Sequence, residues 1–164
     1  MEKVYIGIDN GPSGSIGLVG NSTASMLFPA PIKLLQDYTK KKKNVNRLNP
    51  EKFIEIINTY SNPKMVLIER PFVNPMMFNA TLSAIRFLEA TLIMLESLDI
   101  PYMFLDSKEW QKVLLPEGCK GKEELKKASH DIGIRLFPIC ESVIQKQKDA
   151  DGLLIAEYGR RKGL

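Results

Sequence analysis

Three acidic residues stand at the ends of three apolar runs that are far apart along the chain. Asp9 and Glu69 each follow such a run directly, and Asp151 lies two residues before another. Carboxylates at the ends of buried strands are costly to desolvate and repel one another, so a fold that brings them together needs a counter-charge. A divalent metal ion supplies one. The pattern therefore predicts a metal site of the kind that hydrolyses phosphodiester bonds.

The size and composition of the chain indicate one folded domain. Its 164 residues are 44% hydrophobic and 26% charged, which favours a buried core over disorder. We therefore expect a single domain over residues 1–164. The formal net charge of +4 favours a polyanionic partner such as nucleic acid without requiring one.

Cysteine content and hydropathy indicate the cellular compartment of the protein. Cys119 and Cys140 are too few to staple a domain of this size, and the sequence has no Cys/His cluster with zinc-site spacing. It also shows neither a charged-then-apolar leader nor an apolar run of membrane-spanning length. We expect a soluble cytoplasmic protein with no membrane partner.

The first thirty residues have strand patterning that is interrupted by turn signals. The apolar segments cover residues 4–9, 13–19 and 23–28, and the turn signals are Gly11-Pro12 and Gly20-Asn21. This order predicts an antiparallel meander of three strands.

Farther along the chain, predicted strands alternate with predicted helices. Short buried strands are expected at residues 65–69 and 102–105, and Asn49 and Pro50 suit the cap and first turn of a helix. Further helices are expected at residues 79–98, after Ser107, at residues 122–136 and at residues 149–161. Antiparallel strands followed by this alternation predict an α/β fold, in which helices pack on a mixed sheet.

The predicted helix at residues 79–98 is apolar on more than one face. Its two stripes are Ile85, Leu88, Leu92 and Leu95, and Phe87, Thr91, Met94 and Leu98. One stripe can pack on a sheet, whereas the other needs a further partner. A subunit interface is a candidate.

The segment around Asp9 is rich in glycine. Residues 7–17 contain four glycines, which allow a tight turn and a close backbone approach to a phosphate or a metal-bound ligand. The alternative is an ordinary hairpin turn with a solvated aspartate. The same pattern occurs in the phosphate-binding loops of actin-like ATPases.

The other acidic positions also have two interpretations. Glu69 would lie beside Asp9 if their strands pair, or would form a surface pair with Arg70. In a helix, Asp149 and Asp151 lie on nearly opposite sides, whereas Lys148 and Asp151 share one side. Either aspartate could instead cap the helix.

Several segments in matching order resemble a known family, the RuvC family of Holliday junction resolvases. The resemblance is strongest to its short phage-type members, within the RNase H-like fold. It rests on residues 7–11, 68–72 and 151–158, and also on residues 100–102, 108–112 and 126–128. It covers most of the chain.

This resemblance implies a fold, an activity and a set of metal ligands. The fold is an RNase H-like mixed five-stranded sheet flanked by helices. The activity is that of a homodimeric endonuclease, dependent on Mg²⁺ or Mn²⁺, that resolves four-way junctions of branched DNA by two-metal hydrolysis. The family's metal ligands correspond to Asp9, Glu69 and Asp151. A phage source, with action in the host cytoplasm, is a further implication.

The fourth metal ligand of the family does not match directly. In the family, the fourth ligand lies three residues before the last one. In this chain that position is Lys148, and Asp149 is the next residue. Asp149 could substitute through a shift of the helix start. Alternatively, Lys148 could contact phosphate while water completes the metal shell.

Candidate DNA contacts surround these acids. Phe72 matches an aromatic residue that disturbs base stacking at the crossover in the family, although it could instead pack against residues 76–78. Arg70 lies beside it. The lysines that could contact phosphates are Lys108, Lys112, Lys120, Lys122, Lys126 and Lys127, together with the run at 40–43. The alternative for each lysine run is a solvated face.

Two further residues have structural interpretations. His130 is the sole histidine, and its mid-helix position favours a surface or half-buried structural role over a catalytic one. Trp110 is expected to pack its helix into the core.

Two other function classes are alternatives. A catalytically weak or inactive DNA-binding module of the same fold is favoured only by Lys148 in place of an acid. An actin-like ATPase would need a second phosphate-binding hairpin and a further lobe, for which 164 residues leave no room.

Overall fold

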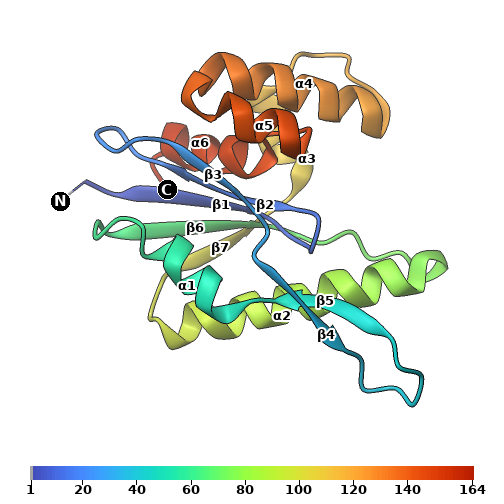
Figure 1. The fold of residues 1–164 in the computed structure, drawn as a ribbon. Helices are drawn as coiled ribbons and strands as arrows, with labels where there is room; N and C mark the ends of the chain where they lie inside the picture. The colour runs from blue at the N-terminus through green and yellow to red at the C-terminus, as the bar shows by residue number, and fades with distance from the viewer. Residues whose placement is uncertain (1) are drawn as a thin grey trace.

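A computed structural model describes residues 2–164 and contains a five-stranded mixed sheet (Figure 1). The strand order is β3-β2-β1-β6-β7, with bounds Met26–Pro29, Ser15–Val19, Val4–Asp9, Lys64–Glu69 and Tyr102–Leu105. The pairs β1–β2 and β2–β3 are antiparallel, whereas β1–β6 and β6–β7 are parallel. The predicted mixed five-stranded sheet and its first meander are confirmed.

Helices cover both faces of this sheet. Figure 1 shows α1 (Pro50–Ile57) and α2 (Phe78–Ser97) on one face. The other face carries α3 (Ser107–Leu114), α4 (Gly121–Leu136), α5 (Glu141–Gln147) and α6 (Asp151–Lys162). Two short 3₁₀ helices, η1 (Pro75–Met77) and η2 (Pro138–Cys140), precede α2 and α5. Because both faces are covered, residues 4–8 are all buried and alternate between two core clusters.

Helix starts follow local capping chemistry. The Asn49 side chain accepts a hydrogen bond from Lys52 N and Pro50 opens α1, as predicted. Helix α3 is capped by Asp106, one residue before the predicted Ser107, through a capping box with Glu109. Helix α6 begins at Asp151 and not at Asp149, because Lys148 adopts a left-handed conformation (φ 72°) that ends α5.

A β-hairpin that the sequence did not predict lies between β3 and α1. It consists of β4 (Ile32–Gln36) and β5 (Asn44–Leu48), which form a separate two-stranded sheet. The lysine run at 40–43 is part of its tip. Figure 1 shows the hairpin extending away from the five-stranded sheet, past α2.

Helix α2 buries one side and exposes the other. Phe87, Thr91 and Leu95 are buried against the sheet, whereas Ile85 and Ile93 are exposed. The buried side draws on both predicted stripes, so the stripes do not correspond to two separate faces. Together with η1, the segment Pro75–Ser97 is long and apolar enough to cross a membrane by length and composition alone. The expectation of no run of that length was therefore wrong, although core helices of soluble proteins pass the same test.

Helix α6 lies directly on the backbone of β1 and β2. A Cβ atom on Gly7 would overlap the backbone of Gly152 and Ala156, and one on Gly17 would overlap Gly152 and Leu153. The Gly152 amide also donates to the Ser15 hydroxyl at 3.1 Å. This contact requires glycine at both strand positions and fixes the start of α6 beside the end of β1.

We expect Gly17→Ala to lower the free energy of unfolding by at least about 1–3 kcal/mol, because the added methyl group must push α6 off the sheet. Chemical denaturation measures this loss. Ser142→Ala is the control, because Ser142 is exposed on α5 and the change adds no atom to the core. Equal losses in the two variants would contradict the close-contact argument.

Candidate active site

The ends of two neighbouring parallel strands place the first two acids. Ile8 pairs with Ile68 in the β1–β6 register, so Asp9 and Glu69 follow at the same edge of the sheet. Parallel pairing brings residues distant in sequence together without any long side chain having to reach across. The condition set by the sequence, that the two strands pair, is therefore met.

The start of α6 brings two further acids to this edge. One carboxylate oxygen from each of Asp9, Asp149 and Asp151 lies within 4.8 Å of the others. Asp149 is buried, and its Oδ1 accepts a hydrogen bond from the Asp151 amide at 3.4 Å. These three residues are called the acidic cluster below. Its members are the last residue of β1, a residue of the connection between α5 and α6, and the first residue of α6.

The left-handed turn at Lys148 determines which side chains face the acidic cluster. Because α6 begins at Asp151, Asp149 is not constrained by helical periodicity and points inward together with Asp151. Lys148 is exposed. The side chain that joins Asp9 and Asp151 is therefore that of Asp149, while Lys148 faces solvent.

Glu69 lies beside the acidic cluster but is oriented toward Trp110. Its Oε2 accepts a hydrogen bond of 2.8 Å from the indole Nε1 of Trp110, which is only 1% exposed. Trp110 therefore packs in the core as expected and also holds Glu69, a contact that the sequence did not predict. Burial raises the pKa of Glu69, and the indole hydrogen bond acts in the opposite direction.

Helix α4 supplies two side chains that hold the aspartates. Lys126 Nζ lies 2.8 Å from Asp149 Oδ2, so this lysine, expected on a DNA-contacting surface, reaches the acidic cluster. The Ser129 hydroxyl donates to Asp151 Oδ1 and accepts from the Ala150 amide at 3.1 Å. Ser129 was not predicted. Its spacing of three residues from Lys126 on one helix face is the sequence signal that links the two.

The electrostatics of the acidic cluster favour a bound cation. The pKa of Asp9 is raised well above its usual value by burial first and then by the charges of Asp151 and Glu69. Burial, followed by the charge of Asp149, raises the pKa of Asp151 to about 7. The hydrogen bond to Asp149 raises the pKa of Lys126. One ammonium group thus faces several carboxylates, which leaves an excess of negative charge.

Asn10 connects the acidic cluster to α2. Its Nδ2 donates a hydrogen bond of 3.1 Å to the carbonyl oxygen of Ala84. Its side-chain oxygen is buried and has no hydrogen-bond partner within residues 2–164. The residue directly after Asp9 therefore ties the end of β1 to the long helix α2.

The predicted contacts next to Glu69 are placed differently from one another. Phe72 is 81% exposed, so it does not pack against residues 76–78, which are themselves exposed. Arg70 forms an ion pair of 2.9 Å with Asp106 and lies over the Phe104 ring. Phe72 is thus free to contact another molecule, whereas the Arg70 side chain is partly engaged within the protein.

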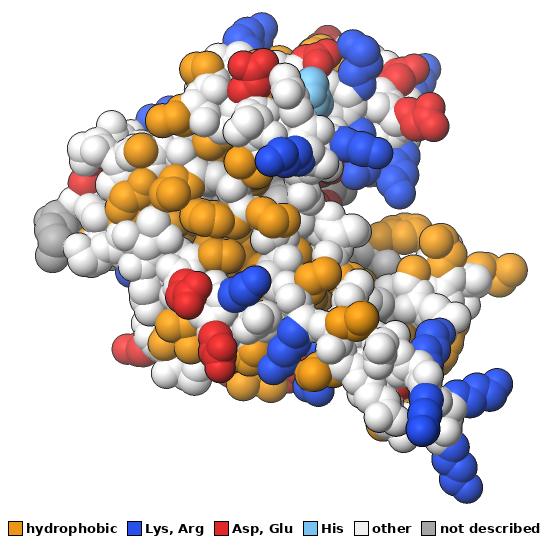
Figure 2. Space-filling view, viewed as in Figure 1, with side chains coloured by type: hydrophobic (Ala, Val, Ile, Leu, Met, Phe, Trp, Pro, Cys, Tyr) orange, Lys and Arg blue, Asp and Glu red, His pale blue; other side chains and the backbone are white. Residues whose placement is uncertain are grey.

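The predicted lysine contacts lie on α3, on α4 and just before α4. Lys108 and Lys112 line a groove of about 450 Å³, and Lys120 and Lys122 are exposed. Lys127 pairs with Asp131 at 3.0 Å. Figure 2 shows Lys and Arg side chains gathered over this helical layer and again at the hairpin tip.

His130 stays outside the acidic cluster. Its Nδ1 lies 2.9 Å from Asp131 Oδ1, and its side chain is half-buried. This placement agrees with the structural role that its position in the sequence favoured.

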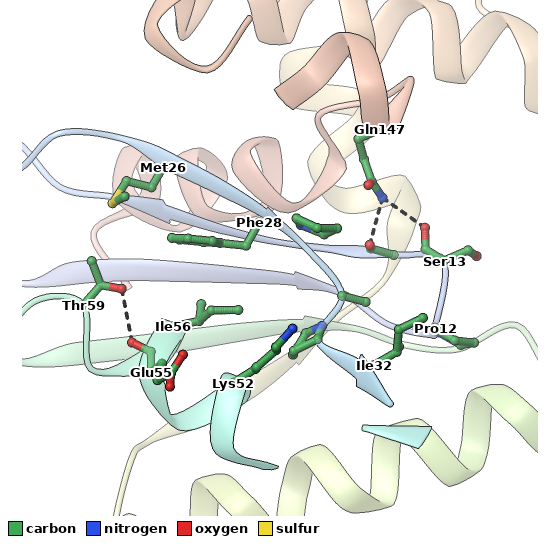
Figure 3. A pocket seen from close by; sticks show the side chains of 14 residues that line it. Pro12, Ser13, Met26, Phe28, Ile32, Lys52, Glu55, Ile56, Thr59 and Gln147 are labelled. Atoms are coloured by element: carbon green, nitrogen blue, oxygen red, sulfur yellow. Dashed lines mark hydrogen bonds between the residues drawn. The ribbon is translucent and has the colours of Figure 1, made fainter. Parts of the chain in front are cut away.

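A cavity of about 760 Å³ lies near the glycine-rich turn but does not belong to the acidic cluster (Figure 3). Apolar side chains such as Phe28 and Ile56 line it, and none of the acidic cluster does. On its wall, Gln147 Nε2 donates to the carbonyl oxygens of Ser13 at 3.1 Å and Gly14 at 2.8 Å. Gln147 therefore fixes the turn that follows Asp9.

Two solved structures share this fold over nearly the whole chain. Thermus thermophilus RuvC in complex with a Holliday junction substrate is 14% identical with a TM-score of 0.62, and the match covers 98% of this chain and 96% of that one. A second structure of Thermus thermophilus RuvC is 16% identical with a TM-score of 0.57 and the same coverage. No protein-family model and no curated protein sequence matches the chain. The chain therefore has a RuvC-like fold, as the sequence resemblance predicted.

In metal-free buffer, we expect the free energy of unfolding to fall as pH rises from about 4 to 7. The pKa of Asp151 is about 7 in the folded protein and near 3.8 when unfolded, so the folded state holds the extra proton in this range. The slope is up to about 1.4 kcal/mol per pH unit for each such proton.

Denaturation at several pH values measures this slope. Asp151→Asn flattens the curve, whereas Glu117→Gln, which changes an exposed acid, leaves it as in the wild type. A wild-type curve that rises over the same range would contradict the proposed electrostatics.

Proposed function

We propose that this protein is a divalent-metal-dependent endonuclease that cuts branched DNA, a crossover junction endodeoxyribonuclease. The observation that carries the proposal is the acidic cluster of Asp9, Asp149 and Asp151 at the edge of a RuvC-like sheet. The structural neighbour that holds a Holliday junction substrate supports branched DNA as the substrate class. Such an enzyme would act in the cytoplasm, and a phage source remains a prediction from the resemblance.

The donor set of the acidic cluster fits a hard divalent cation. All its groups are carboxylate oxygens, which suit Mg²⁺ and allow Mn²⁺ to substitute. Asp9, Asp149 and Asp151 would hold the metal, and Glu69 is the next acid along the sheet edge. When bound, a pair of such ions supplies an activated water and stabilises the departing 3′ oxygen. Products would then carry a 5′ phosphate.

The surrounding residues would orient these carboxylates and the DNA strand. Trp110 and Ser129 each hold one carboxylate by a hydrogen bond, which limits its rotation. Lys126 pairs with Asp149, and its ammonium group would be available to a DNA phosphate if a bound metal ion neutralised Asp149 instead. The exposed Phe72 ring could stack on an unpaired base beside the cut, which contributes roughly 1–3 kcal/mol.

The alternative functions are less well supported. The hypothesis of an inactive DNA-binding module depended on Lys148 replacing an acid. Asp149, however, belongs to the acidic cluster, and Lys148 is exposed. The hypothesis of an actin-like ATPase depended on the glycine-rich turn alone. That turn leads into a fold that matches RuvC over 98% of the chain.

We expect the protein to cut a labelled four-way junction in Mg²⁺, and Asp9→Asn to lower the rate by on the order of 10³-fold through loss of several kcal/mol of transition-state stabilisation. A gel assay of nicked strands measures the rates, and binding in EDTA shows whether the variant still folds and holds DNA. Glu51→Gln, which changes an exposed acid on α1, is the control. Full activity of Asp9→Asn would exclude this site.

We further propose that the protein acts as a homodimer through α2. The exposed side of this helix carries Leu82, Ile85 and Ile93. They form an apolar surface near the edge of the sheet at which Asp9 lies. A two-fold pairing of these helices would cover this surface and place two active sites symmetrically, as paired nicks across a junction require. Asn10 would link each site to the interface through its contact with Ala84.

We expect the double variant Ile85→Asp with Ile93→Glu to be a folded monomer, because buried unpaired charges oppose association. Light scattering after gel filtration measures the mass, and circular dichroism checks the fold. Ile139→Glu is the matched control, because Ile139 is 72% exposed in η2, away from α2. A double variant that remains dimeric would place the interface elsewhere.

A further inference from the structure

We propose that the β4–β5 hairpin, residues 32–48, is a basic arm that binds the phosphate backbone of a DNA duplex outside the acidic cluster. The inference rests on the proposed function, since it takes DNA as the substrate. It adds a second binding surface, which no part of the metal site requires.

The basic arm accounts for the whole positive net charge of the protein. It contains six basic residues, Lys33, Lys40, Lys41, Lys42, Lys43 and Arg47, and one acidic residue, Asp37. The rest of the chain has 17 basic and 18 acidic residues, out of totals of 23 and 19. Long-range attraction to a polyanion therefore originates in the arm and not in the body of the protein.

The geometry of the arm presents these charges to solvent. Its strands pair from Ile32 with Leu48 to Gln36 with Asn44, and the tip is closed by a hydrogen bond of 2.7 Å from the Asp37 amide to the Lys43 carbonyl. Lys40 to Lys43 are all exposed. None of the arm's basic side chains forms an ion pair within the described part of the chain.

The placement of the arm suits a contact with the same DNA that reaches the active site. In Figure 1 the tip extends toward the side to which β1 and β6 run, where Asp9 and Glu69 end their strands. Figure 2 shows the Lys and Arg side chains of the tip projecting from the body of the protein. A duplex arm that leaves the crossover on this side would pass the tip.

A role only in folding does not explain the arm. A two-stranded hairpin is marginally stable by itself, and four consecutive lysines add mutual repulsion. Val45 and Arg47 of β5 lie near Arg86 of α2, in a pocket that Asp37 and Tyr38 also line. Tyr38, at the tip, is 87% exposed. The tip therefore keeps a dense positive charge that no ion pair within residues 2–164 neutralises.

DNA fits the arm better than a second copy of the chain does. Two basic arms would repel each other, and the nearly neutral body offers no compensating excess of acidic residues. A duplex instead carries closely spaced phosphates, and each phosphate that a lysine neutralises adds about 0.9 to the slope of log affinity against log salt concentration.

The test compares a variant in which Lys41, Lys42 and Lys43 are changed to Gln with the wild type. Binding to a labelled four-way junction is measured in EDTA across a salt series, so that no cleavage is needed. The matched control changes Lys3, Lys64 and Lys162 to Gln. These residues lie at the opposite end of the sheet, where Lys3 bonds to the Leu164 carbonyl and Lys64 begins β6. Thermal unfolding checks that both variants fold.

We expect the arm variant to lose at least about tenfold in affinity at moderate salt and to reduce the salt slope by about 2 to 3, while the control stays close to the wild type. Unchanged binding by the arm variant, or equal losses in both variants, would overturn the inference. The mass of the arm variant and its binding to vesicles containing phosphatidylserine are measured as well. A variant that no longer dimerises, or one that loses vesicle binding but keeps DNA binding, would also overturn the inference, because the arm would then serve a subunit or a membrane surface.

The two proposals fail in different ways. Asp9-dependent cleavage with unchanged binding by the arm variant would reject the arm and keep the nuclease. Arm-dependent DNA binding without cleavage by the wild type would reject the nuclease and keep the arm.

Discussion

The direct contact between α6 and the backbone of β1 and β2 is the constraint on which the rest of the structure depends. Gly7 and Gly17 allow the helix to approach, and the Ser15 hydroxyl accepts the Gly152 amide at its first turn. A side chain at either glycine would move the helix and with it Asp151. The position of the last acid relative to the first is therefore set by the close approach that these glycines allow, together with the hydrogen bond from Gly152 to Ser15.

The fold holds several carboxylates close together in a buried position, where their ionisation is unfavourable. The acidic cluster lies where burial and mutual repulsion oppose ionisation, and within residues 2–164 the compensating groups are Lys126 and the Ser129 hydroxyl. The surrounding core, with Trp110 packed beneath Glu69 and α4 packed against α5 and α6, keeps the carboxylates from moving apart. The proposed metal affinity and the stability of the metal-free protein would thus draw on the same repulsion and change in opposite directions.

Much of the fold and part of the candidate site could be predicted from the sequence. The apolar runs that end at Asp9 and Glu69 identified two central strands, because strands buried on both faces read as continuous apolar segments. The hairpin was missed because its strands carry Lys33, Gln36 and Asn46, and their support by α2 exists only in three dimensions.

The sequence left the inward position of Asp149 as one of two alternatives, and the hydrogen bonds to Glu69 and Asp151 were beyond it. The first depends on a left-handed lysine, a conformation that sequence patterns assign to glycine or asparagine. The second depends on Trp110 and Ser129, which lie far from their acidic partners along the chain and meet them only when helices pack on the sheet.

The bond between Trp110 and Glu69 also gives the protein an internal optical reporter. The chain contains one tryptophan, and its indole donates a hydrogen bond directly to the Glu69 carboxylate at the end of β6. Any rotation of Glu69 toward a ligand removes the acceptor from this buried ring. The emission spectrum of the unmodified protein would therefore respond to a change at Glu69, without a dye or a labelled substrate.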